Sequence, residues 1–506
     1  MTIGTYVPGS EAGAVSDEWS LYWTDRGVRV PSGFDGLLDE WVDIDDRERS
    51  LGIESRTPIL VDPIGRIDPR LALFFRRSRF ARHADTTRRS YVIDYRLFFT
   101  FLWQRGKYWH EADYEDLEDY EAWRRRSADN PGRIGGAKWG RELAAFKSFY
   151  DWAVGVGHVD RSPVLTHVVR LRDGACAEVV DQRPKDVRSS NVKWLTPRTF
   201  RLWRDIGLRG YDGGGLRDPR WRGRNETRNA AFADLLFDSG LRLREGGCLL
   251  TLEVPDAVSA QSFYEGTAAA GIAKNRERMF YVSAGAVSGV VAYMTSARRA
   301  AIGRAQGARR YDDLPGLRVV TGISPARQSI TWLDGAGVQR QCRIGTLTPA
   351  QRRCLFVEGR DGLEPLWLWL GESGLPLDHE SWEKVFDAAN ERCARLGKPI
   401  VCSPHTCRHS FALKMLVTLQ RALDRRFGLS DEERRHVRDV YGGAFALVKD
   451  LLGHASEQTT RDVYLEPVTG LRLRMILDGD EDLDTILAQV AASSRRVMDI
   501  APGQEG

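Results

Sequence analysis

The feature that most constrains the fold is a polar, basic stretch at residues 169–192, which separates two parts of different character. It contains the turn-forming pairs Asp173-Gly174 and Arg183-Pro184 and lacks apolar periodicity. A chain of 506 residues also exceeds one ordinary domain. We therefore expect a linker here, with one domain before it and a larger one after it.

Residues 66–168 are predicted to be helical. Between residues 91 and 102, aromatic and apolar side chains recur at helical spacing, and Thr86-Thr87 could cap that helix. Further helices are expected over 114–125 and about 137–154. A generic helical bundle with an aromatic core explains the pattern without any function. Residues 1–65 are rich in Gly, Asp and Ser and are taken as an N-terminal extension of unknown role.

Beyond the linker, Leu195-Thr196-Pro197 predicts the start of a helix, with Thr196 as N-cap and Pro197 in the first position. The later elements expected are a helix over about 229–238 that Gly240 ends, a hairpin within 268–282 and a helix over about 380–396. Residues 304–362 mix strand-like pieces with glycine turns and are interpreted as an insertion.

Composition is that of a globular protein, with 42% hydrophobic and 28% charged residues. The excess of Lys+Arg over Asp+Glu is small (74 − 70 = +4), but arginines cluster over 76–89 and again over 205–228. Such clusters are typical of phosphate binding, and solvated arginine-rich faces explain them equally well. The second cluster could be a mobile loop on a DNA backbone or a solvated insertion.

Seven scattered cysteines form no C-x-x-C pair, and no secretory leader precedes them, which favours reduced thiols in the cytoplasm. No run approaches the ~18 apolar residues of a membrane span.

Four short motifs, widely spaced, carry the chemistry. Arg242 lies in Ser239-Gly240-Leu241-Arg242, and His405-x-x-Arg408 places two side chains on one helical face. A Gly453-His454 turn follows, and Tyr464 comes ten residues after that histidine. Arginines can grip a phosphate with a planar donor fork, histidines can move protons, and a tyrosine can attack phosphorus. Each motif is common alone, but the four in this order indicate phosphodiester chemistry.

The order Arg, His-x-x-Arg, Gly-His, Tyr resembles that of the tyrosine recombinase (phage integrase) family. The resemblance covers about residues 66–490. It implies a mainly α fold with a small β-sheet in the catalytic domain. A helical, SAM-like core-binding domain would span 66–168 and the catalytic domain 193–495, followed by a tail over 496–506.

The resemblance also implies a role for each site residue. Tyr464 would be the nucleophile, and Arg242 and Arg408 would clamp the phosphate. His405 and His454 would bind the phosphate or move protons, and Lys274 would protonate the leaving 5′-oxygen. Glu245 would orient Arg242 without reacting.

Several alternatives stay open at this stage. Arg244 could replace Arg242 in the clamp, and the spacing of His405 and His409 also fits a zinc pair, although Thr406 stands where zincins carry glutamate. The path between His405 and His454 spans 49 residues (454 − 405), roughly twice the usual family interval.

We therefore expect a site-specific recombinase that cleaves and rejoins double-stranded DNA, integrating or excising a mobile element without metal or other cofactor. Its C-terminal helix, over about 483–490, would dock on a neighbour in a homo-tetramer, and an accessory DNA-bending or directionality factor could assist. The alternatives are a type IB topoisomerase-like enzyme and a non-catalytic DNA-binding protein.

Overall fold

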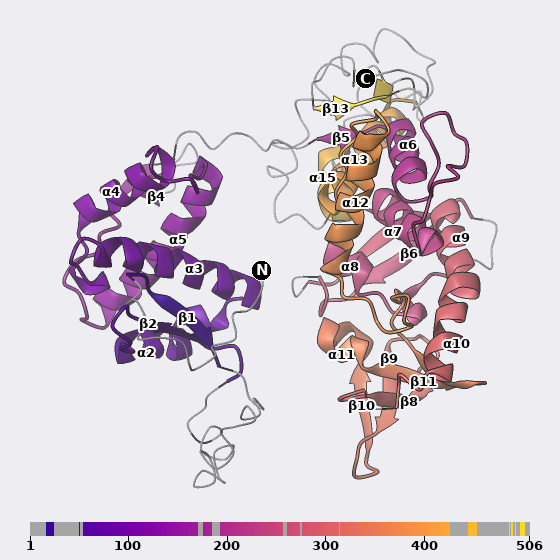
Figure 1. The fold of residues 1–506 in the computed structure, drawn as a ribbon, viewed down its shortest axis with the longest axis horizontal. Coiled ribbons are helices and arrows are strands. Elements are labelled where there is room, and N and C mark those ends of the chain that lie inside the picture. The colour runs from indigo at the N-terminus through magenta and orange to yellow at the C-terminus, as the bar shows by residue number, and fades with distance from the viewer. Residues whose placement is uncertain are drawn as a thin grey trace. The chain divides into compact units, whose positions relative to one another are not determined.

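The chain divides into two compact units, Met1–Arg188 and Ser189–Gly506, here called the N-terminal and C-terminal units (Figure 1). A computed structural model describes residues 17–24, 50, 54–170, 176–184, 193–256, 261–273, 276–312, 314–425, 444–452, 485, 487–488, 491 and 496–500. As expected, the fold is mainly helical with small sheets. Within these ranges, every helix is too short or too polar to span a bilayer.

The N-terminal unit is a helical bundle with two short antiparallel ribbons. The helices expected over 114–125 and 137–154 are confirmed as α4 and α5. The predicted cap of the preceding helix is wrong, because that helix begins at Asp85, ahead of Thr86-Thr87. The elements are β1 (Ser20–Trp23), β2 (Pro58–Val61), α2 (Pro69–Arg77), η2 (Arg79–Arg82), α3 (Asp85–Trp103), η3 (Trp109–Glu111), α4 (Tyr114–Arg125), α5 (Gly136–Gly155), β3 (Thr166–Arg170) and β4 (Cys176–Val180).

Aromatic side chains build the core of this unit. Tyr95 and Phe99, one helical turn apart on α3, both contact Phe149 of α5, at ring-centroid distances of 5.4 and 5.6 Å. Trp19, which directly precedes β1, and Leu60 of β2 are buried in the same core. The described parts of the expected extension, 17–24 and 54–65, therefore pack with the helical bundle.

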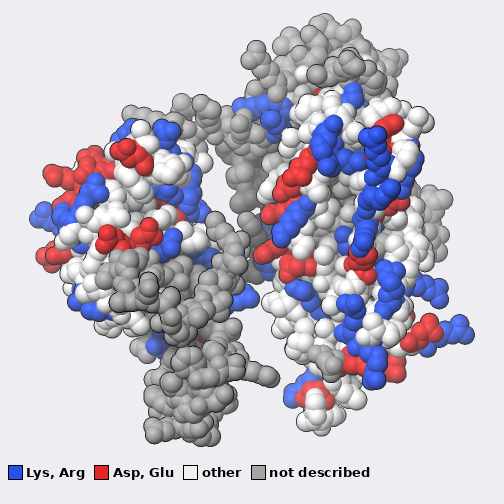
Figure 2. Space-filling view, in the orientation of Figure 1, with Lys and Arg blue, Asp and Glu red and all other residues white. Residues whose placement is uncertain are grey.

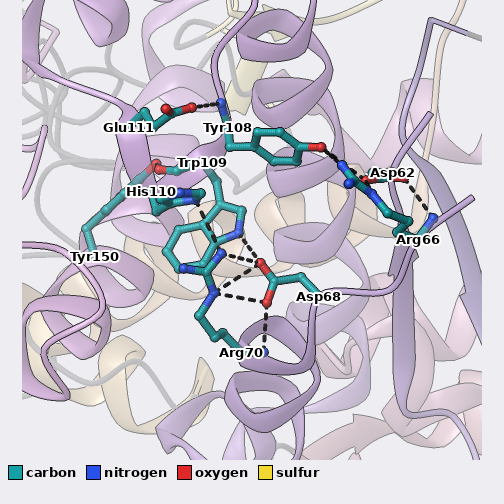
Figure 3. A network of polar contacts seen from close by, with 9 residues as sticks. All are labelled: Asp62, Arg66, Asp68, Arg70, Tyr108, Trp109, His110, Glu111 and Tyr150. Atoms are coloured by element: carbon teal, nitrogen blue, oxygen red, sulfur yellow. Dashed lines mark hydrogen bonds and ion pairs between the residues drawn. The ribbon is translucent and has the colours of Figure 1, made fainter. Parts of the chain in front are cut away.

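A polar network joins α2 to the turn before α4 (Figure 3). Asp68, the N-cap of α2, accepts hydrogen bonds from the backbone N of Arg70 at 2.8 Å and from Nε1 of Trp109 at 2.9 Å. The hydroxyl of Tyr150 donates to the carbonyl of Trp109 at 2.7 Å. Burial would raise the pKa of Asp68, but the hydrogen bonds from Arg70 and Trp109 outweigh it and lower the pKa. The half-buried Asp68 carboxylate thus fixes α2 against η3, and Tyr150 ties η3 to α5.

The segment expected as a linker, 169–192, carries structure in its described part. β3 and β4 form an antiparallel hairpin, and Nε1 of Trp139 donates to the carbonyl of Gln182 at 3.1 Å. The first half of the segment therefore belongs to the N-terminal unit, because its backbone groups find partners there.

The C-terminal unit is a helical core with a five-stranded sheet inserted into it (Figure 1). The predicted cap of its first helix is confirmed, since the Thr196 hydroxyl accepts from the backbone N of Thr199. The elements as far as the insertion are β5 (Trp194–Leu195), α6 (Pro197–Gly207), α7 (Glu226–Ser239), α8 (Leu243–Gly247), η4 (Thr251–Glu253), β6 (Phe263–Ala268), β7 (Arg278–Ser283), α9 (Ala284–Tyr293), η5 (Met294–Arg298) and α10 (Arg299–Gly307).

The insertion forms a sheet of strand order β10-β9-β8-β11-β12, antiparallel except for the parallel β8–β11 pair. Both predicted strand-like pieces, near 318–321 and 329–332, are confirmed as strands of this sheet. The remaining elements are β8 (Arg318–Ile323), β9 (Ser329–Leu333), β10 (Gln339–Arg343), η6 (Ile344–Thr346), α11 (Pro349–Arg353), β11 (Leu355–Gly359), β12 (Gly362–Pro365), α12 (Ser381–Arg395), α13 (Pro404–Arg425), α15 (Ala444–Leu452) and β13 (Val497–Met498).

The segment expected as a tail, 496–506, is anchored in its described part. β13 pairs in parallel with β5, and Asp499 accepts a hydrogen bond from the Thr196 hydroxyl at 2.6 Å. Residues 496–500 therefore close onto the first strand and helix of the unit.

The arginine-rich loop before α7 is tied to the protein by ion pairs. Arg217 pairs with Glu226 at 2.6 Å, and Asp218 accepts from Arg392 of α12 at 2.7 Å. On the face shown in Figure 2, basic and acidic side chains are interspersed over both units. Acidic partners therefore balance part of the positive charge of this loop.

Gly240 is the residue that lets α7 end against α13. It adopts a left-handed backbone, with φ of 63°, at the C-cap of α7. A Cβ built there would lie 2.3 Å from Cδ1 of Phe411 on α13. The close approach brings the C-terminus of α7 to the first turns of α13, where two predicted site residues lie.

Gly240→Ala is expected to lower the free energy of unfolding by at least about 2 kcal/mol, because backbone strain and overpacking each cost about 1–3 kcal/mol. Chemical denaturation of the full chain measures the change. Gly303→Ala is the matched control, since nothing lies within 4 Å of its Cβ position on α10. That variant should match or exceed the wild type by up to ~1 kcal/mol. Equal stability of the two variants would contradict the close approach.

Candidate active site

Three of the predicted site residues line one cavity of about 240 Å³ in the C-terminal unit. Arg242 comes from the N-terminus of α8, and His405 and Arg408 come from the first turns of α13. The other lining residues are Leu243, Glu383, Phe386, Asp387, Ser403 and Pro404. The fold thus brings together side chains that are more than 160 residues apart in the sequence.

The first turn of α13 places His405 at the cavity. Ser403 caps this helix, because its hydroxyl accepts from the backbone N of Thr406 at 3.1 Å, and Pro404 occupies the first helical position. His405 is exposed and its ring stacks on His409, with centroids 6.1 Å apart. The N-terminus of a helix favours anions, so the cavity lies where a phosphate would be stabilised.

Arg408 is buried and fixed by main-chain carbonyls. Only 4% of its surface is exposed. Its Nη1 donates to the carbonyl of Gly240 at 2.5 Å, and its Nη2 donates to the carbonyl of Leu452, at the end of α15. These contacts orient the guanidinium and join the C-termini of α7 and α15.

Glu245 holds Arg242 at the start of α8. Its carboxylate accepts from Nη1 of Arg242 at 2.7 Å and from the backbone N of Arg242 at 2.8 Å. Glu245 is fully buried, and burial alone would raise its pKa. The charge and hydrogen bond of Arg278, with those of Arg242, outweigh burial and lower the pKa. The carboxylate is therefore ionised at neutral pH, and it hydrogen-bonds both the backbone and the side chain of Arg242.

The sequence did not identify the second partner of Glu245. Arg278 lies at the start of β7, with 7% of its side chain exposed, and its Nη2 donates to Glu245 at 2.5 Å. Period-2 alternation could have found it, because Arg278 falls on the inward face of β7 with the buried Phe280 and Val282.

Arg244, the alternative to Arg242, points elsewhere. Its Nη2 donates to the carbonyl of Gly271 at 3.1 Å, in the turn between β6 and β7. The backbone N of Gly271 donates to the carbonyl of Gly345, at 2.8 Å, and a Cβ on Gly271 would lie 2.3 Å from the carbonyl oxygen of Leu347. The segment around η6, which follows β10, therefore packs against the backbone at Gly271.

Arg352 ties the segment after β10, which contacts Gly271, to the rest of the C-terminal unit. The side chain is fully buried. It donates to the carbonyls of Ile344 and Leu347 and to the Glu253 carboxylate at 2.6 Å. The segment after β10 is thus tied to η4, close to α8 in the chain.

The remaining predicted site residues, Lys274, His454 and Tyr464, lie outside the described residues, as does most of the expected C-terminal helix. Among the residues that the structure does describe, no group of three or more His, Cys, Asp or Glu side chains could hold a metal ion.

Comparison with known families places the N-terminal unit. Residues 74–157, from within α2 to just beyond α5, match the phage integrase N-terminal SAM-like domain. This part of the N-terminal unit is similar to a phage integrase SAM-like domain. This match confirms, for that part of the chain, the family that the motifs near the C-terminus indicated.

Solved structures give weaker likenesses to this integrase-like chain. A XerH site-specific recombinase bound to a palindromic difH substrate is 11% identical, with a TM-score of 0.40, over 78% of this chain and 79% of that one. The Tn1549 transposon integrase with transposon right end DNA is 10% identical, with a TM-score of 0.43, over 78% and 98%. The integrase from mycobacterium phage Brujita is 15% identical, with a TM-score of 0.19, over 81% and 94%. These scores are too low to carry a functional argument, and no curated protein matches the chain.

Glu245→Gln is expected to lower the free energy of unfolding at neutral pH by about 3–5 kcal/mol, because it leaves buried Arg278 without a counter-charge. Since folding lowers the pKa of Glu245 from 4.5, its stabilisation is present above pH 4.5. It is lost as the pH falls through the folded-state pKa, so the difference between variant and wild type should shrink there. Urea denaturation as a function of pH measures this.

The matched control is Asp312→Asn, which breaks the exposed Arg309–Asp312 pair, 84% and 44% exposed. It should cost no more than about 1 kcal/mol. A pH-independent loss in Glu245→Gln would contradict an ionised carboxylate.

Proposed function

We propose that the chain is a site-specific DNA recombinase that cleaves and rejoins DNA through a phosphotyrosine. The observation that carries the proposal is the shared cavity of Arg242, His405 and Arg408. A second line of support is the similarity of residues 74–157 to the SAM-like domain of phage integrases. Neither finding alone would distinguish an enzyme from a DNA-binding protein on the same fold.

The two arginines suit the charge that develops on phosphorus. Attack by an oxygen nucleophile adds negative charge to the non-bridging oxygens, and positioned guanidinium groups stabilise it. Arg408 is held by two carbonyls and Arg242 by Glu245, so neither side chain needs to be ordered when the phosphate arrives. Glu383 and Asp387, the acidic residues of the cavity lining, are exposed, and water screens their charge.

The covalent step that we propose gives a chemical role to each predicted site residue outside the described ranges. The hydroxyl of Tyr464 would attack the scissile phosphorus, forming the tyrosyl O–P bond and breaking the bond to the 5′-oxygen. His405 or His454 would take the tyrosine proton, and Lys274 would give a proton to the leaving oxygen. In the reverse step, a 5′-hydroxyl from a partner duplex would attack the phosphotyrosine. The assignments of Lys274, His454 and Tyr464 rest on their sequence motifs.

The setting we propose is integration or excision of a mobile element in the cytoplasm. Double-stranded DNA would be the partner, bound chiefly through phosphate contacts, and four copies would act together. The resemblance to tyrosine recombinases implies no cofactor and leaves room for an accessory DNA-bending or directionality factor.

Covalent adduct formation tests the proposal. The full chain is mixed with labelled duplexes that carry the ends of its own element, and the mixture is denatured without proteolysis. The fraction of labelled DNA in a shifted band on a denaturing gel measures the covalent adduct. Wild type should form a shifted band and Tyr464→Phe should form none, a loss of at least about 10³-fold, as when a nucleophile is removed. Tyr441→Phe, the tyrosine that precedes the Gly-His turn, should keep the band.

Other outcomes point elsewhere. A band that survives in Tyr464→Phe would move the nucleophile to another residue. Tight binding without any band would favour the DNA-binding protein, and relaxation of supercoils without strand exchange would favour the topoisomerase-like enzyme.

A further inference from the structure

Arg278 is a cation beside the candidate site whose side chain is only 7% exposed and which the proposed chemistry does not use. It is absent from the residues that line the cavity. Its Nε is buried and has no hydrogen-bond partner within the described residues, an arrangement that costs free energy. Such a side chain is retained only where its other contacts compensate.

Those contacts connect two sides of the site. Nη2 of Arg278 donates to the Glu245 carboxylate at 2.5 Å, and the other carboxylate oxygen accepts from Arg242. Nη1 of Arg278 donates to the carbonyl of Leu451 at 2.7 Å, in the last turn of α15. Arg278 therefore joins the support of Arg242 to the C-terminus of α15.

The end of α15 is held by two arginines at once. Arg278 takes the carbonyl of Leu451 and Arg408 takes that of Leu452, so two carbonyls that the helix leaves unpaired are satisfied. The negative end of the helix dipole adds to the attraction. In the sequence, His454 follows Leu452 by two residues and Tyr464 by twelve.

We infer that Arg278 is a positioning residue for the phosphodiester reaction. It holds Arg242 in place through Glu245 and fixes the point from which the chain continues toward His454 and Tyr464. The inference rests on the proposed function for its link to catalysis, but its structural part does not.

The geometry also explains why a lysine at position 278 should not replace the arginine in this positioning role. The guanidinium of Arg278 presents two Nη groups to two acceptors in different directions. A lysine side chain is shorter and carries one ammonium group, so it cannot reach both acceptors. Arg278→Lys keeps the charge next to Glu245 and gives up the forked reach from Glu245 to Leu451.

Hydrogen exchange tests the structural part without any DNA. In Arg278→Lys, amides of residues 444–452 should exchange faster than in wild type, while those of α12 should not change. Arg276→Gln, an exposed arginine two residues earlier, is the matched control and should leave both segments unchanged. Unchanged exchange at 444–452 in Arg278→Lys would overturn the anchoring role, and a global increase would show unfolding, in which case Arg278→Gln replaces it.

Adduct formation with two DNA substrates tests the catalytic link. On ordinary DNA, Arg278→Lys should slow adduct formation by about tenfold to a hundredfold, as expected when a reacting group shifts by ~1 Å. A methylphosphonate at the scissile position is neutral and makes less demand on the arginine clamp. The deficit relative to wild type should therefore shrink several-fold on that DNA.

The outcomes separate the two proposals. An equal deficit on both substrates would overturn the action of Arg278 through the arginine clamp. Wild type that forms no adduct on either substrate would contradict the proposed function, while the hydrogen-exchange result would still decide whether Arg278 anchors α15.

Discussion

The buried carboxylate of Glu245 is the interaction on which the candidate site depends. It accepts hydrogen bonds from the backbone and side chain of Arg242 and from Arg278, so one anion balances two arginines. Moving a carboxylate into the protein interior is costly, and only such pairing makes it favourable. Because the three charged groups come from α8 and β7, the start of the helix and the start of the strand are fixed together. The first turns of α13 join this arrangement through the carbonyl of Gly240, which accepts from both Arg408 and Arg278.

Local features of the sequence were sufficient to predict most helices and part of the site. α4 begins and ends at the residues expected for it, 114 and 125, and Thr196 caps α6 as its position before proline predicted. His405 and Arg408 could be placed on one face because their spacing matches a helical turn. The meeting of that face with Arg242 could be expected only from the family resemblance, since 166 residues (408 − 242) separate the two arginines.

Long-range contacts explain what the sequence did not reveal. The role of Arg278 could not be inferred from the sequence, because its partners Glu245 and Leu451 are 33 and 173 residues away in the chain. The anchoring of residues 496–500 on β5 was missed for the same reason, as a two-residue parallel strand leaves no periodic signal. The inserted sheet was recognised as strands, but its contact with Gly271 depends on a backbone approach that no pattern encodes. The arginine cluster at 205–228 overstated the basic surface, because Glu226, in the same stretch of chain, pairs with Arg217.

The pairing of β13 with β5 has a topological consequence for the segment that carries Tyr464. Its upstream end is fastened where Leu452 meets Arg408, and its downstream end is fastened where Val497 meets Trp194. Both fixed points belong to the C-terminal unit. Transfer of β13 to a second copy of the chain would therefore first require the release of its pairing with β5. The pairing of β5 with β13 therefore opposes such a transfer, independently of the arginines of the candidate site.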